Sequence, residues 1–219
     1  MLRLLFEKTG EVIWISHLDL MRLFQRAFKR ANLPLTHTQG YNPRPSVSIA
    51  LPLSVGVESV CELLDFELEG ERVDCCEIMD RLNHALVKGV KVLACYDTGK
   101  KIKELAFLKC CVALEYDQGV PENAEQSISD LFKQESLLVE KKGKNGMTEQ
   151  DIIPMIRSLS VDGENAHTLK ILATVCCQNP SLNPMQLVAA IERYLPQFKP
   201  DHAVCRRMEI YDTKEQVFR

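Results

Sequence analysis

An amphipathic helix is predicted by the stretch SHLDLMRLFQRAFKRANLP, residues 16–34. Ser16 and Asp19 have the spacing of a capping box, with Asp in place of Glu, and Asp19 puts a negative charge in the first turn. Asn32 and Pro34 end the helix. Apolar residues recur at helical spacing and predict one buried face: Leu18, Met21, Phe24, Phe28 and Ala31.

Extended segments surround this helix. Residues 2–7 alternate and predict a strand, and residues 12–15 predict a second short extended piece. Further along, the pattern predicts three strands and one helix: strands at 47–53, 61–68 and 90–95, and a helix at 76–87. The order β-α-β-β-α-β is typical of a ferredoxin-like split βαβ unit.

A polar stretch, residues 97–104, is typical of a linker, and the pattern then restarts. Strands are predicted at 107–114, 137–140, 169–176 and 203–211, and helices at 123–132 and 184–194. Residues 151–159 are ambiguous, because Pro154 disfavours a long helix there. We therefore expect an α+β protein of two tandem ferredoxin-like units with antiparallel sheets. The first domain covers residues 1–98, and a second, elaborated one covers 104–219.

The charge of the chain is uneven. The 219 residues carry a net charge of -3, and the pI of about 6.0 excludes a general polyanion binder. Residues 1–50 nevertheless hold seven Lys and Arg against three Asp and Glu, whereas residues 51–100 hold five against ten. No apolar run approaches the ~20 residues of a membrane span, and no targeting signal is evident, so we expect a cytoplasmic protein without membrane contact.

The cysteines favour a structural role. There are nine, none in a Cys-x-x-Cys, and six of them form adjacent pairs: Cys75–Cys76, Cys110–Cys111 and Cys176–Cys177. Neighbouring residues on a strand point to opposite faces and cannot easily clamp one metal ion. We therefore expect reduced thiols, no metal site and no cofactor, although a cluster assembled from distant cysteines is the alternative.

The predicted first helix carries a basic face. Arg22, Arg26 and Arg30 lie four residues apart and stack on one side, with Lys29 beside Arg26. Arginine forks suit phosphate oxygens, and a basic helix face is a common footprint of nucleic-acid binding. The alternative is a solvated face, paired with the acidic residues of the segment 58–80.

The loop THTQGYNPRP, residues 36–45, is the second candidate. Gly40 permits a close backbone approach, and two prolines fix the shape of the loop. Polar and aromatic groups in it could grip a phosphate or a base: Gln39, Tyr41, Asn42 and Arg44. The alternative is a rigid connection that happens to be polar.

Histidines offer the only candidate acid/base groups, namely His17 and His37. Asp19 does not share the face of His17, so the alternative for His17 is a local hydrogen bond at the helix cap. The lysines around Gly143, in residues 141–146, could touch a phosphate backbone or form a soluble turn. Gly-rich phosphate motifs and a Gly-x-Ser-x-Gly elbow are absent.

Five segments of the N-terminal half resemble those of a known family: LRLLFEKTG (2–10), ISHLDLMR (15–22), QRAFKRANLP (25–34), QGYNPRP (39–45) and LPLSVGVES (51–59). The resemblance is to the bacterial radical SAM-linked protein family, and its best later echo is KGKNGMTEQDI (142–152). Members occur beside, or fused to, a B12-binding-type radical SAM enzyme, often near genes for a ribonuclease and ribosomal proteins. The resemblance therefore implies a radical SAM partner and a ribosome-related or RNA-related role. The chain lacks the Cys-x-x-x-Cys-x-x-Cys signature, so iron–sulfur chemistry would belong to that partner.

These observations predict an accessory binding module, without catalysis of its own, that engages RNA through one composite site in residues 17–45. Its members are Arg22, Arg26, Lys29, Arg30 and Arg44 on phosphates, Gln39, Tyr41 and Asn42 on a base, and His17 as an orienting group. One alternative is an RNA-processing or RNA-modifying enzyme that uses His17 or His37 as acid/base. Another is a protein-docking subunit that does not contact nucleic acid.

Overall fold

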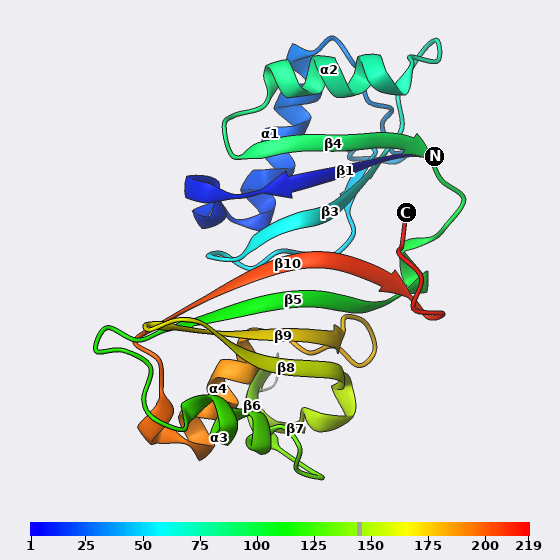
Figure 1. Ribbon diagram of the computed structural model, residues 1–219. Coiled ribbons are helices and arrows are strands. Elements are labelled where there is room, and N and C mark those ends of the chain that lie inside the picture. The colour runs from blue at the N-terminus through cyan, green and yellow to red at the C-terminus, as the bar shows by residue number, and fades with distance from the viewer. Residues whose placement is uncertain (144–145) are drawn as a thin grey trace. The chain divides into compact units, whose positions relative to one another are not determined.

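The computed structural model describes residues 1–143 and 146–219, and the chain divides into two α+β units (Figure 1). Unit 1 comprises Met1–Ile102 together with Arg219, and unit 2 comprises Lys103–Phe218. Each unit contains an antiparallel sheet and two α-helices. Among the described residues, no helix has the length and hydropathy needed to span a lipid bilayer.

Unit 1 contains four strands, two α-helices and a 3-10 helix: β1 (Leu2–Lys8), η1 (Gly10–Trp14), α1 (His17–Arg30), β2 (Val47–Ile49), β3 (Glu58–Phe66), α2 (Cys75–Ala85) and β4 (Val90–Asp97). The strands lie in the order β4-β1-β3-β2, and every neighbour is antiparallel. The helices α1 and α2 pack on one face of this sheet, where they close a single apolar core.

Helix α1 begins as the sequence predicts. The hydroxyl of Ser16, the N-cap, accepts a hydrogen bond from the backbone N–H of Asp19. The predicted core position of Phe24 is confirmed, with its ring 4.7 Å from that of Phe6. Leu18 was predicted in the buried face and is instead 66% exposed, because the buried face is centred on Leu20, about 200° around the helix axis from Leu18.

Of residues 12–15, predicted as an extended piece, 12–14 lie in a 3-10 helix and only Ile15 is extended. Gly10 has φ +66°, which turns the chain after β1 into the 3-10 helix η1. The ammonium of the buried Lys8 then donates hydrogen bonds to the carbonyls of Ile13 and Ile15, both at 3.0 Å. A buried side-chain donor five and seven residues before its acceptors, which hydrophobic periodicity does not reveal, therefore stabilises the shape of this segment.

A buried ion pair joins β1 to β3 on the other face of the unit 1 sheet. The guanidinium of Arg3, which is fully buried, donates to both carboxylate oxygens of Asp65 at 2.6 and 3.0 Å. The same guanidinium also donates to the carbonyl of Lys100 at 3.0 Å. This network ties the end of unit 1 to its sheet.

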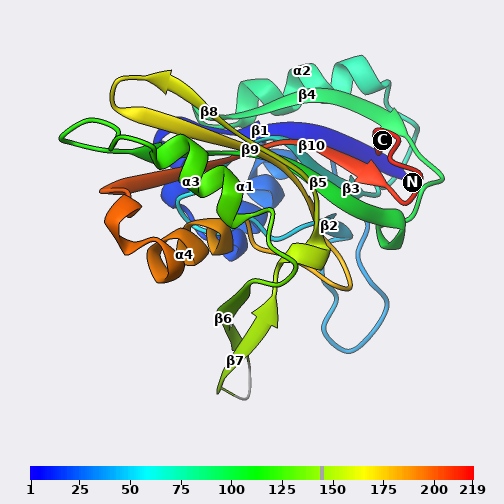
Figure 2. The ribbon, with the colours of Figure 1, turned by 60° about the horizontal axis from the view of Figure 1, so that its bottom comes forward.

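Unit 2 repeats this strand order with an added hairpin. Its elements are η2 (Ile102–Glu104, which starts in unit 1), β5 (Leu105–Glu115), α3 (Ala124–Leu131), β6 (Leu138–Gly143), β7 (Gly146–Asp151), η3 (Ile153–Met155), β8 (Ile156–Asn165), β9 (Thr168–Cys176), α4 (Met185–Tyr194), η4 (Pro196–Phe198) and β10 (His202–Asp212). The sheet order is β10-β5-β9-β8, all antiparallel, and β6 and β7 form a separate hairpin (Figure 2).

The segment 141–146 was predicted as a loop. Lys141 instead pairs with Thr148 within the β6–β7 hairpin, and the ambiguous stretch 151–159 contains the end of β7, η3 and the start of β8. Lys144 of the predicted lysine loop lies outside the described residues. Charged, exposed hairpin strands lack the apolar alternation from which strands are predicted, which explains the miss.

Candidate functional site

The outward face of α1 is cationic. Leu18, Arg22, Arg26 and Lys29 point away from the core, because they lie on the side opposite the buried residues of the helix. The helix carries four Lys and Arg against one Asp. This set of four outward residues is called the α1 stripe below.

One cation of the α1 stripe has an acidic partner. The guanidinium of Arg22 donates to the carboxylate of Asp19 at 3.0 Å. Hydrogen bonds from the Ser16 hydroxyl and then from Arg22 hold the pKa of the Asp19 carboxyl below its usual range. Within residues 1–143 and 146–219, Arg26 and Lys29 have neither an ion pair nor a side-chain hydrogen bond, and both are exposed. Two cations are therefore available to an external anion.

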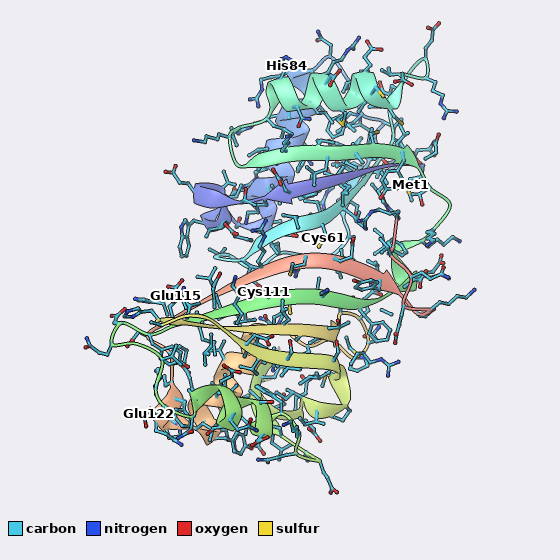
Figure 3. The ribbon with its side chains drawn as sticks, in the orientation of Figure 1. Met1, Cys61, His84, Cys111, Glu115 and Glu122 are labelled. Carbon is cyan, nitrogen blue, oxygen red and sulfur yellow. The ribbon has the colours of Figure 1, made fainter. Side chains whose placement is uncertain are left out.

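Arg30 differs from these two cations. Its guanidinium donates to the carbonyl of Ala85, the last residue of α2, at 2.6 Å. A cation at the C-terminal end of a helix stabilises the unpaired carbonyls there. Arg30 also borders a hollow of about 490 Å³ together with His84, which Figure 3 places at this end of α2. The structure thus gives Arg30 a bond inside unit 1.

The predicted loop is a closed hairpin-like turn between α1 and β2. The backbone N–H of Thr38 donates to the carbonyl of Arg44 at 2.8 Å, and that of Ser46 donates to the carbonyl of Thr36 at 2.7 Å. The Thr38 hydroxyl accepts from the N–H of Arg44 at 3.1 Å. These bonds fix the base and leave the tip in solvent, with Tyr41 100% exposed. The segment 36–46 is called the 36–46 turn below.

The two histidines occupy separate positions. His37 lies at the base of the 36–46 turn, with Nδ1 3.6 Å from the carboxylate of Glu69, and both side chains are exposed. His17 is the first residue of α1 and is half-buried. Its Nδ1 is enclosed and has no hydrogen-bond partner within the described part of the chain.

The predicted composite site is separated along α1. Lys8, at the end of β1, donates to the carbonyl of Ile15, so α1 starts near this end of the sheet. At the opposite end of the sheet, Leu2 pairs with Phe66. Leu35, just before the 36–46 turn, forms a β-bridge with Leu68 beyond that end. A helix of 14 residues is about 20 Å long, so His17 lies that far from Arg30 along the axis. Arg26, Lys29 and Arg30 are brought together on the half of α1 that leads, after five residues, into the 36–46 turn.

Sequence patterns missed an exposed aromatic residue at the start of α1. Trp14, the last residue of η1, is 69% exposed and lies beside the glycine at position 56, where an added Cβ would be 3.3 Å from the indole ring. Val55 and Leu18 are also exposed, at 53% and 66%. The only signal in the sequence was a Trp two residues before the helix cap Ser16, which does not by itself reveal exposure.

Hollows and thiols contribute no further member to the predicted site. A hollow of about 650 Å³ lies beside η1 and the α2–β4 connection, and none of the predicted site residues lines it. All nine cysteines are free, among them Cys61 on β3 and Cys111 on β5 (Figure 3). Burial raises the pKa of the Cys111 thiol. Over residues 1–143 and 146–219, no three His, Cys, Asp or Glu side chains are grouped as a metal site requires.

Comparison with solved structures shows a distant likeness of fold. A chain in the crystal structure of a Cbf5-Nop10-Gar1 complex is similar with a TM-score of 0.50 and 10% identity, over 95% of this chain and 48% of that chain. This chain thus spans about half of the length of that one. An unknown protein from Galdieria sulphuraria, 12% identical over 94% of this chain and 96% of its own, has a TM-score of 0.27, which is too low to bear on the fold.

Comparison with protein sequences identifies a family. No curated protein matches the chain. The model of a family described as "Uncharacterized protein conserved in bacteria (DUF2344)" matches residues 1–184, most of the 219. The chain therefore belongs to the DUF2344 family of uncharacterized bacterial proteins.

Proposed function

We propose that this protein is an accessory module that binds RNA through the α1 stripe and the 36–46 turn. The observation that carries the proposal is the pair of exposed cations, Arg26 and Lys29, for which the described residues provide no acidic partner. Such cations can neutralise the phosphates of a nucleic acid, and the counterions that had been condensed on those phosphates are then released. Exposed cations that had acidic partners within the fold would have favoured a solvated helix face instead.

Each predicted residue then has a role. Arg22, Arg26 and Lys29 contact phosphates from α1, and Arg44 does so from the 36–46 turn. Tyr41 stacks on a base, with the amides of Gln39 and Asn42 beside it to hydrogen-bond a base edge. Arg30 adds positive charge to this end of α1 while it remains bonded to Ala85.

The positions of the histidines support binding over catalysis. A general acid or base must reach the reacting group together with the residues that hold the substrate. His37 faces Glu69 on the surface, whereas the Nδ1 of His17 is enclosed at the opposite end of α1, so neither ring is presented beside the other. The alternative enzyme that uses either histidine thus has no assembled centre in its favour.

The finer features of fold and partner are also part of this proposal. If the β6–β7 hairpin is left out, each unit has four strands among the described residues, and numbered along the chain they lie side by side in the order 4-1-3-2. This arrangement supports the interpretation of two tandem ferredoxin-like units. The partner we propose is a radical SAM enzyme, on the strength of the motifs in residues 2–59. The alternative, a docking subunit without nucleic acid, uses the same cations on an acidic protein surface.

Charge reversal on α1 tests the proposal. We expect Arg26→Glu/Lys29→Glu to weaken binding of a short single-stranded RNA by about tenfold or more, because two attractive charges become repulsive. The measurement is fluorescence anisotropy at low salt. Arg30 stays intact in this variant, so the bond to α2 is kept.

Lys88→Glu/Lys91→Glu is the matched control. It makes the same change in net charge within unit 1, at Lys88 in the α2–β4 connection and Lys91 at the start of β4, and both lysines are exposed. The control is expected to retain most of the affinity. Equal losses in the two variants, or no loss in the α1 variant, would show that α1 is not the binding surface.

A further inference from the structure

We infer that Trp14 is a stacking platform for an unpaired base, and that the RNA lies along α1 as a single strand. The inference rests on the proposed function and names its ligand class. Single exposed apolar side chains are common on protein surfaces, but a group of neighbouring ones marks an interaction site. Three exposed ones occur around the N-terminal end of α1: Trp14, whose ring lies beside Gly56, Val55, which precedes that glycine, and Leu18, four residues after Trp14.

The backbone that presents Trp14 is held from both sides. The ammonium of Lys8 donates to the carbonyls of Ile13 and Ile15, the two residues that flank Trp14. The carbonyl of Ile13 also accepts the N–H of the glycine at position 56 at 2.9 Å. A buried cation with two backbone acceptors fixes a short segment firmly, so little conformational entropy is lost when a ligand binds there.

The indole ring lies against the backbone of Gly56. At Gly56 an added Cβ would meet the ring at 3.3 Å, so a glycine allows the backbone to approach the indole closely. The ring is nevertheless 69% exposed. Stacking on such a ring contributes ~1–3 kcal/mol per base and tolerates any base, because every base has a π-face.

The cations continue from this platform in one direction. Successive members of the α1 stripe, from Leu18 to Arg22 and on to Arg26, are four residues apart, so each step advances about 6 Å along the helix. Lys29 follows at the end of the row, and the helix as a whole carries four Lys and Arg against Asp19. This arrangement suits a single strand of RNA whose first base stacks on the indole and whose following phosphates contact the cations of α1.

This arrangement favours a single strand over a duplex. In a duplex the faces of internal bases are covered by their neighbours, and only backbone and groove edges remain for the protein. An unpaired strand exposes base faces and phosphates together, as a ring followed by a cationic row requires. An acidic protein surface could bury the indole as well as pair with the cations, and the fluorescence titrations below distinguish that occupant from a single strand.

Intrinsic fluorescence tests the inference directly, because Trp14 is the only Trp of the chain. We expect oligouridylate to quench Trp14 emission with the same Kd as the anisotropy titration, and a blunt RNA duplex of equal length to leave the emission nearly unchanged. Trp14→Ala is expected to weaken oligouridylate binding by about 5–100-fold, the fold-change that corresponds to the loss of one stacked base.

Trp14→Phe is the matched variant, since it retains an aromatic face and is expected to keep most of the affinity. Unchanged emission on binding, together with unchanged affinity of Trp14→Ala, would overturn the inference. Polyglutamate represents an acidic protein surface. If polyglutamate or the duplex quenched Trp14 emission as strongly as oligouridylate does, the inference would also be overturned. If oligouridylate binds and only the Arg26→Glu/Lys29→Glu change weakens it, the proposed function stands and the platform does not. If oligouridylate does not bind at all, both fail.

Discussion

Units 1 and 2 follow the same strand order, yet they place their charges differently. Unit 1 buries Arg3, Lys8, Glu62 and Asp65, whereas the buried charged residue of unit 2, among those described, is Asp212. Helix α1 of unit 1 has four Lys and Arg, while α3 of unit 2 has none and α4 has one, Arg193, bonded to Glu149 at 2.8 Å. The two units thus share the order of their strands. They differ in the buried charged residues of their sheets and in the number of cations on their helices.

The difference separates what builds the fold from what is available for binding. In unit 2, Arg193, Lys199 and Lys170 each form an ion pair with an acidic residue of the same unit. On α1, Arg26 and Lys29 have none among the described residues. A buried charge in unit 1, Lys8, in turn shapes the segment that exposes Trp14. The following changes test this contrast.

Breaking the buried ion pair of unit 1 should have the largest effect. Asp65→Ala leaves the guanidinium of Arg3 buried without its carboxylate, and we expect a loss of about 3–5 kcal/mol in the free energy of unfolding. Urea denaturation followed by Trp14 emission and by far-UV circular dichroism measures this loss.

An exposed pair in unit 2 serves as the control. Glu149→Ala removes the partner of Arg193, and both side chains are about half exposed, so the expected loss is at most about 1 kcal/mol. Losses of equal size in the two variants would mean that burial does not distinguish the ion pairs of the two units.

Removing the buried ammonium of Lys8 should have an intermediate effect. Lys8→Met deprives the carbonyls of Ile13 and Ile15 of their donor, and we expect the protein to lose roughly 1–3 kcal/mol of stability. The emission maximum of Trp14 should shift as well, since the backbone around it loosens. Unchanged emission in a destabilised variant would show that Lys8 supports the fold but does not hold Trp14 in place.

Helix caps should give the smallest effect. Ser16→Ala removes the side-chain acceptor of α1 and is expected to cost about 1 kcal/mol. In unit 2, Asn123 precedes α3 in a left-handed conformation, φ 62°, and makes no side-chain cap. Asn123→Gly should therefore change the melting temperature very little. A larger loss in Asn123→Gly than in Ser16→Ala would reverse this ranking.

Much of unit 1 could be predicted from local sequence signals. The cap at Ser16, the core position of Phe24 and the order of helices and strands all follow from spacing and capping chemistry. The exposure of Leu18 could not be predicted, because three neighbouring leucines, at 18, 20 and 23, each fit a helical period. Only packing against β1 and β3 determines which side of α1 is buried.

The exposure of single candidate residues could be predicted, whereas their arrangement in space could not. Spacing along α1 located Arg26 and Lys29 correctly on an exposed face. The bond from Arg30 to Ala85 joins residues 55 positions apart, and the bonds of Lys8 shape a segment that appears extended by pattern alone. Contacts of this kind depend on tertiary structure, which explains why Trp14 was missed and why His17 was grouped with a turn at the far end of the helix.

The salt dependence of RNA binding tests the central claim, that unpaired cations of α1 bind phosphates, most directly. The slope of log K against log salt concentration should fall in magnitude by about 1.4 in Arg26→Ala/Lys29→Ala, or about 0.7 for each lost phosphate contact. Arg193→Ala/Lys199→Ala removes two cations from unit 2, each paired within the fold, and should leave the slope of the unmodified protein unchanged. Equal slopes for the α1 variant and the unmodified protein would contradict the account.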